Sequence, residues 1–74
     1  MDIGTKALKR LGKRIRKFRE NKKLSQEAFA DEVNLARSYI SGVERGKRNL
    51  SFKALVRIAK CLEITLSELC EGIS

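Results

Sequence analysis

The sequence predicts a compact all-α domain, on the basis of its length, its composition and the spacing of its apolar residues. The chain has 74 residues, which suffice for one small domain with a modest core. Its 42% hydrophobic content is too high for a disordered chain, and 35% charged residues with no Pro and few aromatic residues favour helices. Apolar residues recur at helical spacing, and helix-start motifs follow one another along the chain. We therefore expect residues 1–74 to form a single domain of five short helices.

The first helix is predicted at about residues 6–21. Its apolar positions step by three, four and three residues, which places them on one side of a helix. They are Leu8, Leu11, Ile15 and Phe18. Gly12 lies inside this helix at a cost of about 1 kcal/mol relative to Ala, which close packing against another element would explain.

Three later helix starts share one motif. A hydroxyl residue caps the free N–H groups of the first turn, and apolar residues directly before it and four positions after it clamp the entry of the chain. The caps are Ser25, Ser51 and Thr65, and the helices that they begin span about residues 26–33, 52–62 and 66–71.

Another helix is predicted at about residues 37–45, and its start lacks the hydroxyl. Ala36 occupies the capping position, so the first N–H groups need a different partner, either water or a phosphate group. Asn34 ends the preceding helix at a position that requires positive φ, and Gly46 follows the helix as a C-terminal cap.

The short connection between these two helices forces them to cross steeply. Such a crossing needs a small residue where the backbones approach, and apolar residues in the turn and on the second helix. Ala30, Leu35, Ile40 and Val43 supply them. This arrangement is the helix-turn-helix motif, whose second helix enters the major groove of DNA.

The formal net charge of +8 is unevenly distributed. Residues 1–23 hold ten Lys or Arg and two acids, and the rest of the chain sums to zero. This sum of zero is made up of a net charge of −3 for residues 24–36, +4 for residues 37–53 and −1 for residues 54–74. A strongly basic small domain indicates a polyanionic partner.

Several function classes are excluded by residues that the sequence lacks. It contains no His and only two Cys, Cys61 and Cys70, which cannot complete a structural zinc site or a disulfide framework. No nucleophile–base pair or phosphate loop can be assembled, so we expect no enzyme, no cofactor and no metal. No sensor domain for a small-molecule ligand fits in this length. No apolar run is long enough to span a membrane, and we expect a cytoplasmic protein.

The sequence resembles the phage-repressor and Cro-type (XRE-like) helix-turn-helix family over about residues 7–71. The resemblance is carried by the run SQEAFADEVNLARSYISGVERGKRN, with a matching RIRKFRE helix before it. Within the family, RSYISGVERGKRN is most similar to the small controller proteins of restriction–modification systems. The resemblance implies a homodimeric transcription regulator that binds double-stranded DNA at a palindromic operator. RNA polymerase is a candidate further partner.

The helix at 37–45 is then the candidate recognition helix. With Ile40 and Val43 toward the core, its opposite side shows Ser38, Ser41, Gly42 and Arg45, with Arg37 on the flank. We expect base contacts from Arg37, Ser38, Tyr39 and Ser41. Arg37 could instead be an ordinary solvated charge, and Ser41 could be uninvolved. The family commonly contacts a base from the position of Gly42, which a Gly cannot do, so part of the readout would pass to DNA shape.

Phosphate contacts are expected at the edges of the motif. The resemblance implies one from Gln26, which could otherwise be a simple helix-terminal residue. The basic turn and the next helix start add the remaining candidates, which are Arg45, Lys47, Arg48, Asn49 and Lys53. Such a run of charge could also be a solvated face.

Two structural roles complete the expectations. Glu44 lies close to Ile40 on the helical wheel, so it should be partly buried and need a partner, and the resemblance implies an ion pair with Arg19. The apolar residues at the end of the chain exceed what a small core needs, so we expect a dimer interface there, with core packing as the alternative. They are Leu66, Leu69, Cys70 and Ile73.

Two other functions stay open. A phage-type or chromosomal repressor, or an antitoxin-like autoregulator, would have the same motif. A protein of another class, a basic amphipathic element that binds RNA or a membrane surface, would suit the helix at 6–21 alone. Lipid binding would not require the motif at residues 26–45.

Overall fold

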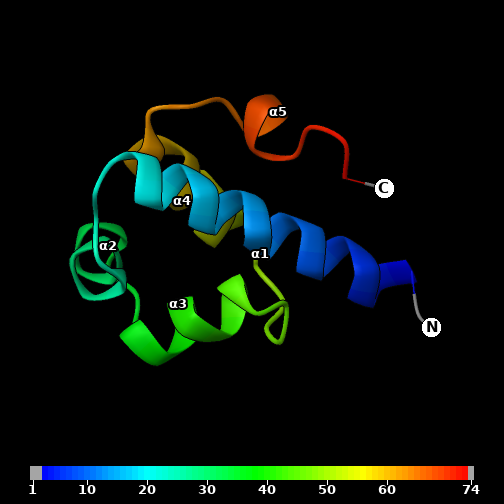
Figure 1. The fold of residues 1–74 in the computed structure, drawn as a ribbon, viewed down its shortest axis with the longest axis horizontal. Coiled ribbons are helices and arrows are strands. Elements are labelled where there is room, and N and C mark those ends of the chain that lie inside the picture. The colour runs from blue at the N-terminus through cyan, green and yellow to red at the C-terminus, as the bar shows by residue number, and fades with distance from the viewer. Residues whose placement is uncertain (1–2, 74) are drawn as a thin grey trace.

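Five helices make up residues 3–73, the part of the chain that the computed structural model describes (Figure 1). The predicted domain of 1–74 also includes residues 1, 2 and 74, which lie outside this part. The helices are α1 (Ile3–Asn21), α2 (Gln26–Val33), α3 (Arg37–Glu44), α4 (Phe52–Leu62) and α5 (Leu66–Leu69). Residues 3–73 contain no strand, in agreement with the predicted all-α class.

The helix starts are built by the caps that the sequence indicates. The hydroxyl of Ser25 accepts a hydrogen bond from the Ala28 N–H at 3.0 Å, and the hydroxyl of Ser51 does the same for Ala54. Thr65 forms a capping box at the start of α5. The Ala36 position makes no side-chain hydrogen bond to the first turn of α3. The entry to α3 is therefore the one of these four starts that leaves backbone donors without a side-chain partner.

The observed helix bounds differ by one to three residues from the approximate bounds expected for α1, α3 and α5. α1 begins at Ile3, three residues before the predicted start at residue 6, and so includes Gly4 despite its low helix propensity. α3 ends at Glu44, because Arg45 is its cap and Gly46 takes a φ of 73°. α5 stops at Leu69 rather than at residue 71, because Cys70 already leaves the helical conformation and Gly72 has a φ of 76°. Asn34 adopts the positive φ expected of it, 58°.

α1 lies across the molecule, with α3 on one side of it and α5 on the other (Figure 1). The core between the helices contains fully buried residues from all of them, among them Ile15, Phe29, Ile40, Ile58 and Leu69. Burial of Leu69, with 0% of its surface exposed, contradicts its predicted place on a dimer surface. In the part of the chain described, Leu69 serves the core of its own domain.

Gly12 brings α1 and α3 into close contact. A Cβ atom at this position would overlap the carbonyl oxygens of Val43 and Glu44, the second at 2.7 Å. Real Cβ atoms essentially never approach so closely, so the two backbones could not pack this way around any other residue. Gly12 lowers the stability of α1 as a helix, but it allows α3 to pack this closely against α1.

Candidate nucleic-acid interface

The exposed side of α3 begins at its N-terminus. Arg37 and Ser38 are exposed in the first turn, and Ser41 is half-buried one turn later. Ile40 and Val43 are buried in the core and hold the helix in place. The free N–H groups at this uncapped end and the positive end of the helix dipole favour an anion beside Arg37. The arrangement presents polar side chains of recognition-helix type on a surface open to solvent.

The loop after α3 is fastened back onto the helix. The Tyr39 hydroxyl donates to the Asn49 carbonyl oxygen at 3.1 Å, and the guanidinium of Arg48 lies 5.6 Å from the centre of the Tyr39 ring. Tyr39 is half-buried between them. The hydroxyl proton of Tyr39 is thus used within the protein, which leaves the ring and the acceptor capacity of the hydroxyl oxygen for the predicted contact with DNA.

Gly42 is buried, and its predicted place on the exposed side of α3 is wrong. The stem of Arg48 covers it, with the Arg48 Cγ only 2.7 Å from where a Cβ of residue 42 would lie. The wheel alone could not show this, because the covering residue comes from the loop and not from the helix. Any larger residue at 42 would displace Arg48.

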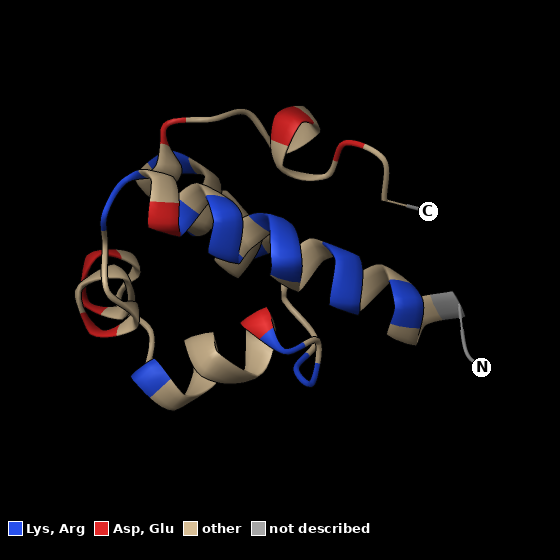
Figure 2. Cartoon of the chain, in the orientation of Figure 1, with Lys and Arg blue, Asp and Glu red and all other residues tan. Residues whose placement is uncertain are grey.

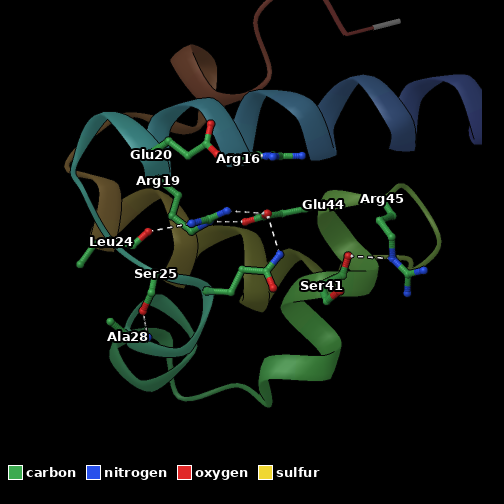
Figure 3. Close-up of polar contacts among 10 residues, drawn as sticks. Arg16, Arg19, Glu20, Leu24, Ser25, Ala28, Ser41, Glu44 and Arg45 are labelled. Carbon is green, nitrogen blue, oxygen red and sulfur yellow. Dashed lines mark hydrogen bonds and ion pairs between the residues drawn. The ribbon is translucent and has the colours of Figure 1, made fainter.

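The remaining candidate phosphate ligands surround this loop. Lys47, Arg48 and Asn49 are exposed in it, and Lys53 is exposed in the first turn of α4. Arg45 is exposed and its Nε donates to the Ser41 carbonyl oxygen at 3.4 Å (Figure 3). Figure 2 shows basic residues at the start of α3 and again in the loop that follows it, whereas α2 carries acidic residues.

Arg19 and Glu44 meet in a buried ion pair that locks α3 to α1 (Figure 3). Arg19 Nε lies 2.6 Å from Glu44 Oε2, and its Nη2 lies 3.0 Å from Glu44 Oε1. The third donor, Nη1, bonds the Leu24 carbonyl oxygen at 2.7 Å. The side chains are only 9% and 3% exposed, and the hydrogen bond to Glu44 raises the pKa of Arg19 above its ordinary value. The Arg19–Glu44 pair is thus bidentate, and its role is to hold α1 and α3 together.

Gln26 joins this pair from the first turn of α2. Its Nε2 donates to Glu44 Oε1 at 3.1 Å, so Glu44 connects α1, α2 and α3. The sequence indicated Gln26 as a phosphate ligand and missed this bond, since no spacing rule links positions 26 and 44. One hydrogen of the Nε2 group is used on Glu44, and the second is available to an acceptor outside the protein.

The two cysteines are free thiols, and no group of three or more metal-ligating residues forms within residues 3–73. Cys61 donates to Glu32 Oε2 at 2.9 Å, and burial, with help from that bond, raises the pKa of its thiol to about 12. Such a thiol is a poor nucleophile at neutral pH. Among the described helices none is long and apolar enough to cross a membrane.

The family model described as helix-turn-helix matches residues 15–69, which include every helix except the first part of α1. The chain belongs to the phage-repressor and Cro-type helix-turn-helix family. It is 48% identical to the control protein C.MunI of Mycoplasma sp over 65 residues, 86% of this chain and 88% of that one. It is 45% identical to the solved restriction-modification controller protein C.AhdI from Aeromonas hydrophila, with a TM-score of 0.81, covering 84% of this chain and 94% of that one.

A solved complex with DNA has the same fold. The biofilm master regulator SinR bound to DNA matches with a TM-score of 0.78 and 29% identity over 82% of this chain and 98% of that one. This helix-turn-helix protein therefore shares its helix arrangement with a protein that was solved on DNA.

Some apolar side chains of this helix-turn-helix protein keep part of their surface exposed to solvent. Phe52, at the start of α4, is 71% exposed, and among the described residues it is the one large hydrophobic side chain that is exposed. The exposure of Phe52 was not predicted from the sequence. The signal was available in the staple pair, because Leu50 and Leu55 pack inward and position 52 is then directed to solvent. Apart from the buried Leu69, the predicted interface residues are half-buried against the core and keep part of their surface exposed. They are Leu66, Cys70 and Ile73.

Proposed function

We propose that this chain is a sequence-specific DNA-binding transcriptional regulator that binds a palindromic operator as a homodimer in the cytoplasm. The observation that carries the proposal is the exposed first turn of α3, whose Arg37 and Ser38 stand beside a basic loop on a helix locked in place by Glu44. A rigid helix with a polar, cationic outer face is the geometry that major-groove recognition needs.

Sequence readout falls mainly to Arg37. Arg37 is exposed and forms no ion pair with a described residue, so its guanidinium can donate two parallel hydrogen bonds to the O6 and N7 atoms of guanine. Ser38 and Ser41 follow on the same side of α3 and suit a base edge or a phosphate oxygen. Tyr39 contributes its ring edge to a thymine methyl group or a sugar. Residue 42 takes no part, because Gly has no side chain and Arg48 packs over its backbone.

Register on the duplex comes from contacts with the phosphate backbone. Lys47, Arg48, Asn49 and Lys53 supply exposed donors along one edge of α3, and Arg45 extends them. At the other edge, the second N–H of the Gln26 amide is directed by its bond to Glu44 and is the donor for a phosphate. These contacts carry affinity and its salt dependence, and they carry little sequence information.

A homodimer would double the readout by placing two α3 helices about 34 Å apart, one turn of B-DNA. The apolar side chains available to such an interface are Phe52 and the exposed parts of Leu66, Cys70 and Ile73. Phe is among the residue types enriched in protein–protein interfaces, so an exposed Phe52 supports a contact with a second copy of the chain.

The particular regulator that we propose is a restriction–modification controller protein, with RNA polymerase as a further partner. Support comes from the 48% identity to C.MunI, which extends over most of both chains. Such a protein would bind its own promoter and adjust expression of the restriction endonuclease. The membrane-surface alternative loses its basis, because the apolar side of α1, with Leu11 and Ile15, lies in the core.

A gel shift tests this proposal. The probe is a duplex taken from directly upstream of the coding sequence, challenged with an excess of unrelated duplex at about 50 and 200 mM salt. We expect a complex that survives the competitor at both salt concentrations and that carries two protein chains. Equal competition by unrelated and upstream DNA at both concentrations would refute sequence-specific binding.

A further inference from the structure

A row of cations on α1 takes no part in the interface at α3. Its members are Lys6, Arg10, Lys13 and Lys17, which are all exposed and follow one another at positions i, i+4, i+7 and i+11. We call this row the α1 stripe. None of its side chains forms an ion pair with a described residue, whereas the neighbouring Arg16 is paired with Glu20. Four unpaired like charges in a row repel one another, so an anion beside them is stabilising.

The stripe is directed away from α3. At 100° per residue, its centre lies about 130° around the helix from Gly12, the residue that contacts the α3 backbone. Arg14 occupies the side toward α5, where its Nε donates to the Leu69 carbonyl oxygen at 2.9 Å. Figure 2 shows basic residues at successive turns of α1 and others in the loop after α3. DNA held by α3 therefore leaves the stripe uncovered.

We propose that the α1 stripe binds the phosphate backbone of a second segment of double-stranded DNA while α3 holds the first. This inference rests on the proposed function, because a first duplex must already be bound. The stripe extends about 16 Å along the helix axis, at 1.5 Å per residue. DNA carries a phosphate charge about every 1.7 Å of its own axis, so several phosphates lie within reach of the long Lys and Arg side chains.

The composition of the stripe favours a duplex over other anionic partners. It includes no aromatic side chain on which an unpaired base could stack, which single-stranded nucleic acid binding usually requires. It includes no apolar side chain that could enter a membrane, since the apolar side of α1 is buried. Exposed, mobile cations alone suit a contact with any duplex, independent of its sequence.

Two variants with equal charge test the proposal. The stripe variant carries Arg10→Gln, Lys13→Gln and Lys17→Gln, and the control variant carries Lys23→Gln, Arg57→Gln and Lys60→Gln. Each lowers the formal net charge from +8 by three, and all six residues are exposed. The upstream duplex is immobilised and saturated with full-length protein, and capture of a labelled, unrelated 30-bp duplex is then measured over a range of salt concentrations. Loading of the immobilised duplex is recorded first, and it reports separately on the proposed function.

The wild type and the control variant should capture the second duplex, and the stripe variant should bind it at least about tenfold more weakly. The slope of log affinity against log salt should become shallower by about 2.7, from 0.9 for each of three lost phosphate contacts. The proposal is overturned if the loaded wild type captures no second duplex, or if both variants lose capture equally. Preferential capture of a single-stranded RNA of the same length would also overturn it, by assigning the stripe to RNA.

Discussion

Replacing Arg19 with Met should be among the most damaging single substitutions in this chain. Arg19→Met keeps the apolar stem of the side chain but removes three hydrogen bonds, two to Glu44 and one to the Leu24 carbonyl oxygen. The Glu44 side chain is 3% exposed, so its charge would remain in the interior with Gln26 as its one side-chain donor. Leaving such a charge uncompensated costs about 3–5 kcal/mol.

That cost is a large part of the total stability. A 74-residue domain has a free energy of unfolding of about 4–11 kcal/mol, from 0.05–0.15 kcal/mol per residue. Since 1 kcal/mol corresponds to about 4–8 °C in a domain of this size, Arg19→Met should lower Tm by at least about 12 °C. Thermal unfolding followed by circular dichroism, with urea titration for the free energy, measures both quantities.

The matched control is Arg16→Met on the same helix, which removes one charge and an exposed ion pair with Glu20. That pair is 3.2 Å long and more than half exposed on both sides, so its loss should cost about 0.5 kcal/mol or less. The double variant Arg19→Met with Glu44→Met should recover most of the lost stability, because it removes the stranded charge. A Tm for Arg19→Met within error of the wild type would refute the structural role assigned to this pair.

Three further predictions follow from the packing and the thiol. Gly12→Ala should lower the free energy of unfolding by about 1–3 kcal/mol in urea titration despite the helix propensity of Ala, because the new Cβ would overlap two α3 carbonyl oxygens; unchanged or higher stability would contradict the close approach. The raised pKa of Cys61 means that its contribution to stability is present below the ordinary thiol value of 9.0 and is lost as pH rises from 9 toward 12. The wild type should therefore lose more unfolding free energy between pH 8 and 10 than Cys61→Ala, and equal losses would show that the thiol is not shielded. Phe52→Ser should leave Tm nearly unchanged but weaken the dimer at least about tenfold in sedimentation, because Phe52 is exposed. Leu69→Ala should instead lower Tm, because it destabilises the core by about 2–5 kcal/mol. The reverse pattern would assign Leu69 to the dimer interface and Phe52 to the core.

Local signals in the sequence were sufficient for most of the fold. Ser25, Ser51 and Thr65 mark helix starts because a hydroxyl at that position bonds the first-turn N–H groups whatever surrounds it. Asn34 marks an end for a similarly local reason, its tolerance of positive φ. Such features depend on a few adjacent residues, so spacing alone identifies them.

Features that depend on distant residues were predicted poorly from spacing, and the distant pair that was expected, Arg19 with Glu44, came from the family resemblance. Gly42 is buried by Arg48, which belongs to a loop whose path no helical wheel describes. The hydrogen bond from Gln26 to Glu44 joins the first residue of α2 to the last residue of α3. Leu69 is fully buried and Phe52 is 71% exposed, a difference that depends on how the helices pack and that the spacing of apolar residues alone does not show. Base-contacting residues need the DNA itself, so Arg37, Ser38, Tyr39 and Ser41 stay predictions.

Selection of bound sites from a random duplex pool tests the central claim most directly. The wild type should enrich a palindrome whose two half-sites are about one helical turn apart and contain a conserved G·C pair. Arg37→Ala should still bind DNA but should lose the preference at that pair, because the lost hydrogen bonds are worth about 1–3 kcal/mol of discrimination. If the wild type enriches no sequence, or if Arg37→Ala enriches the same palindrome with the same preference, α3 does not read DNA in the manner described.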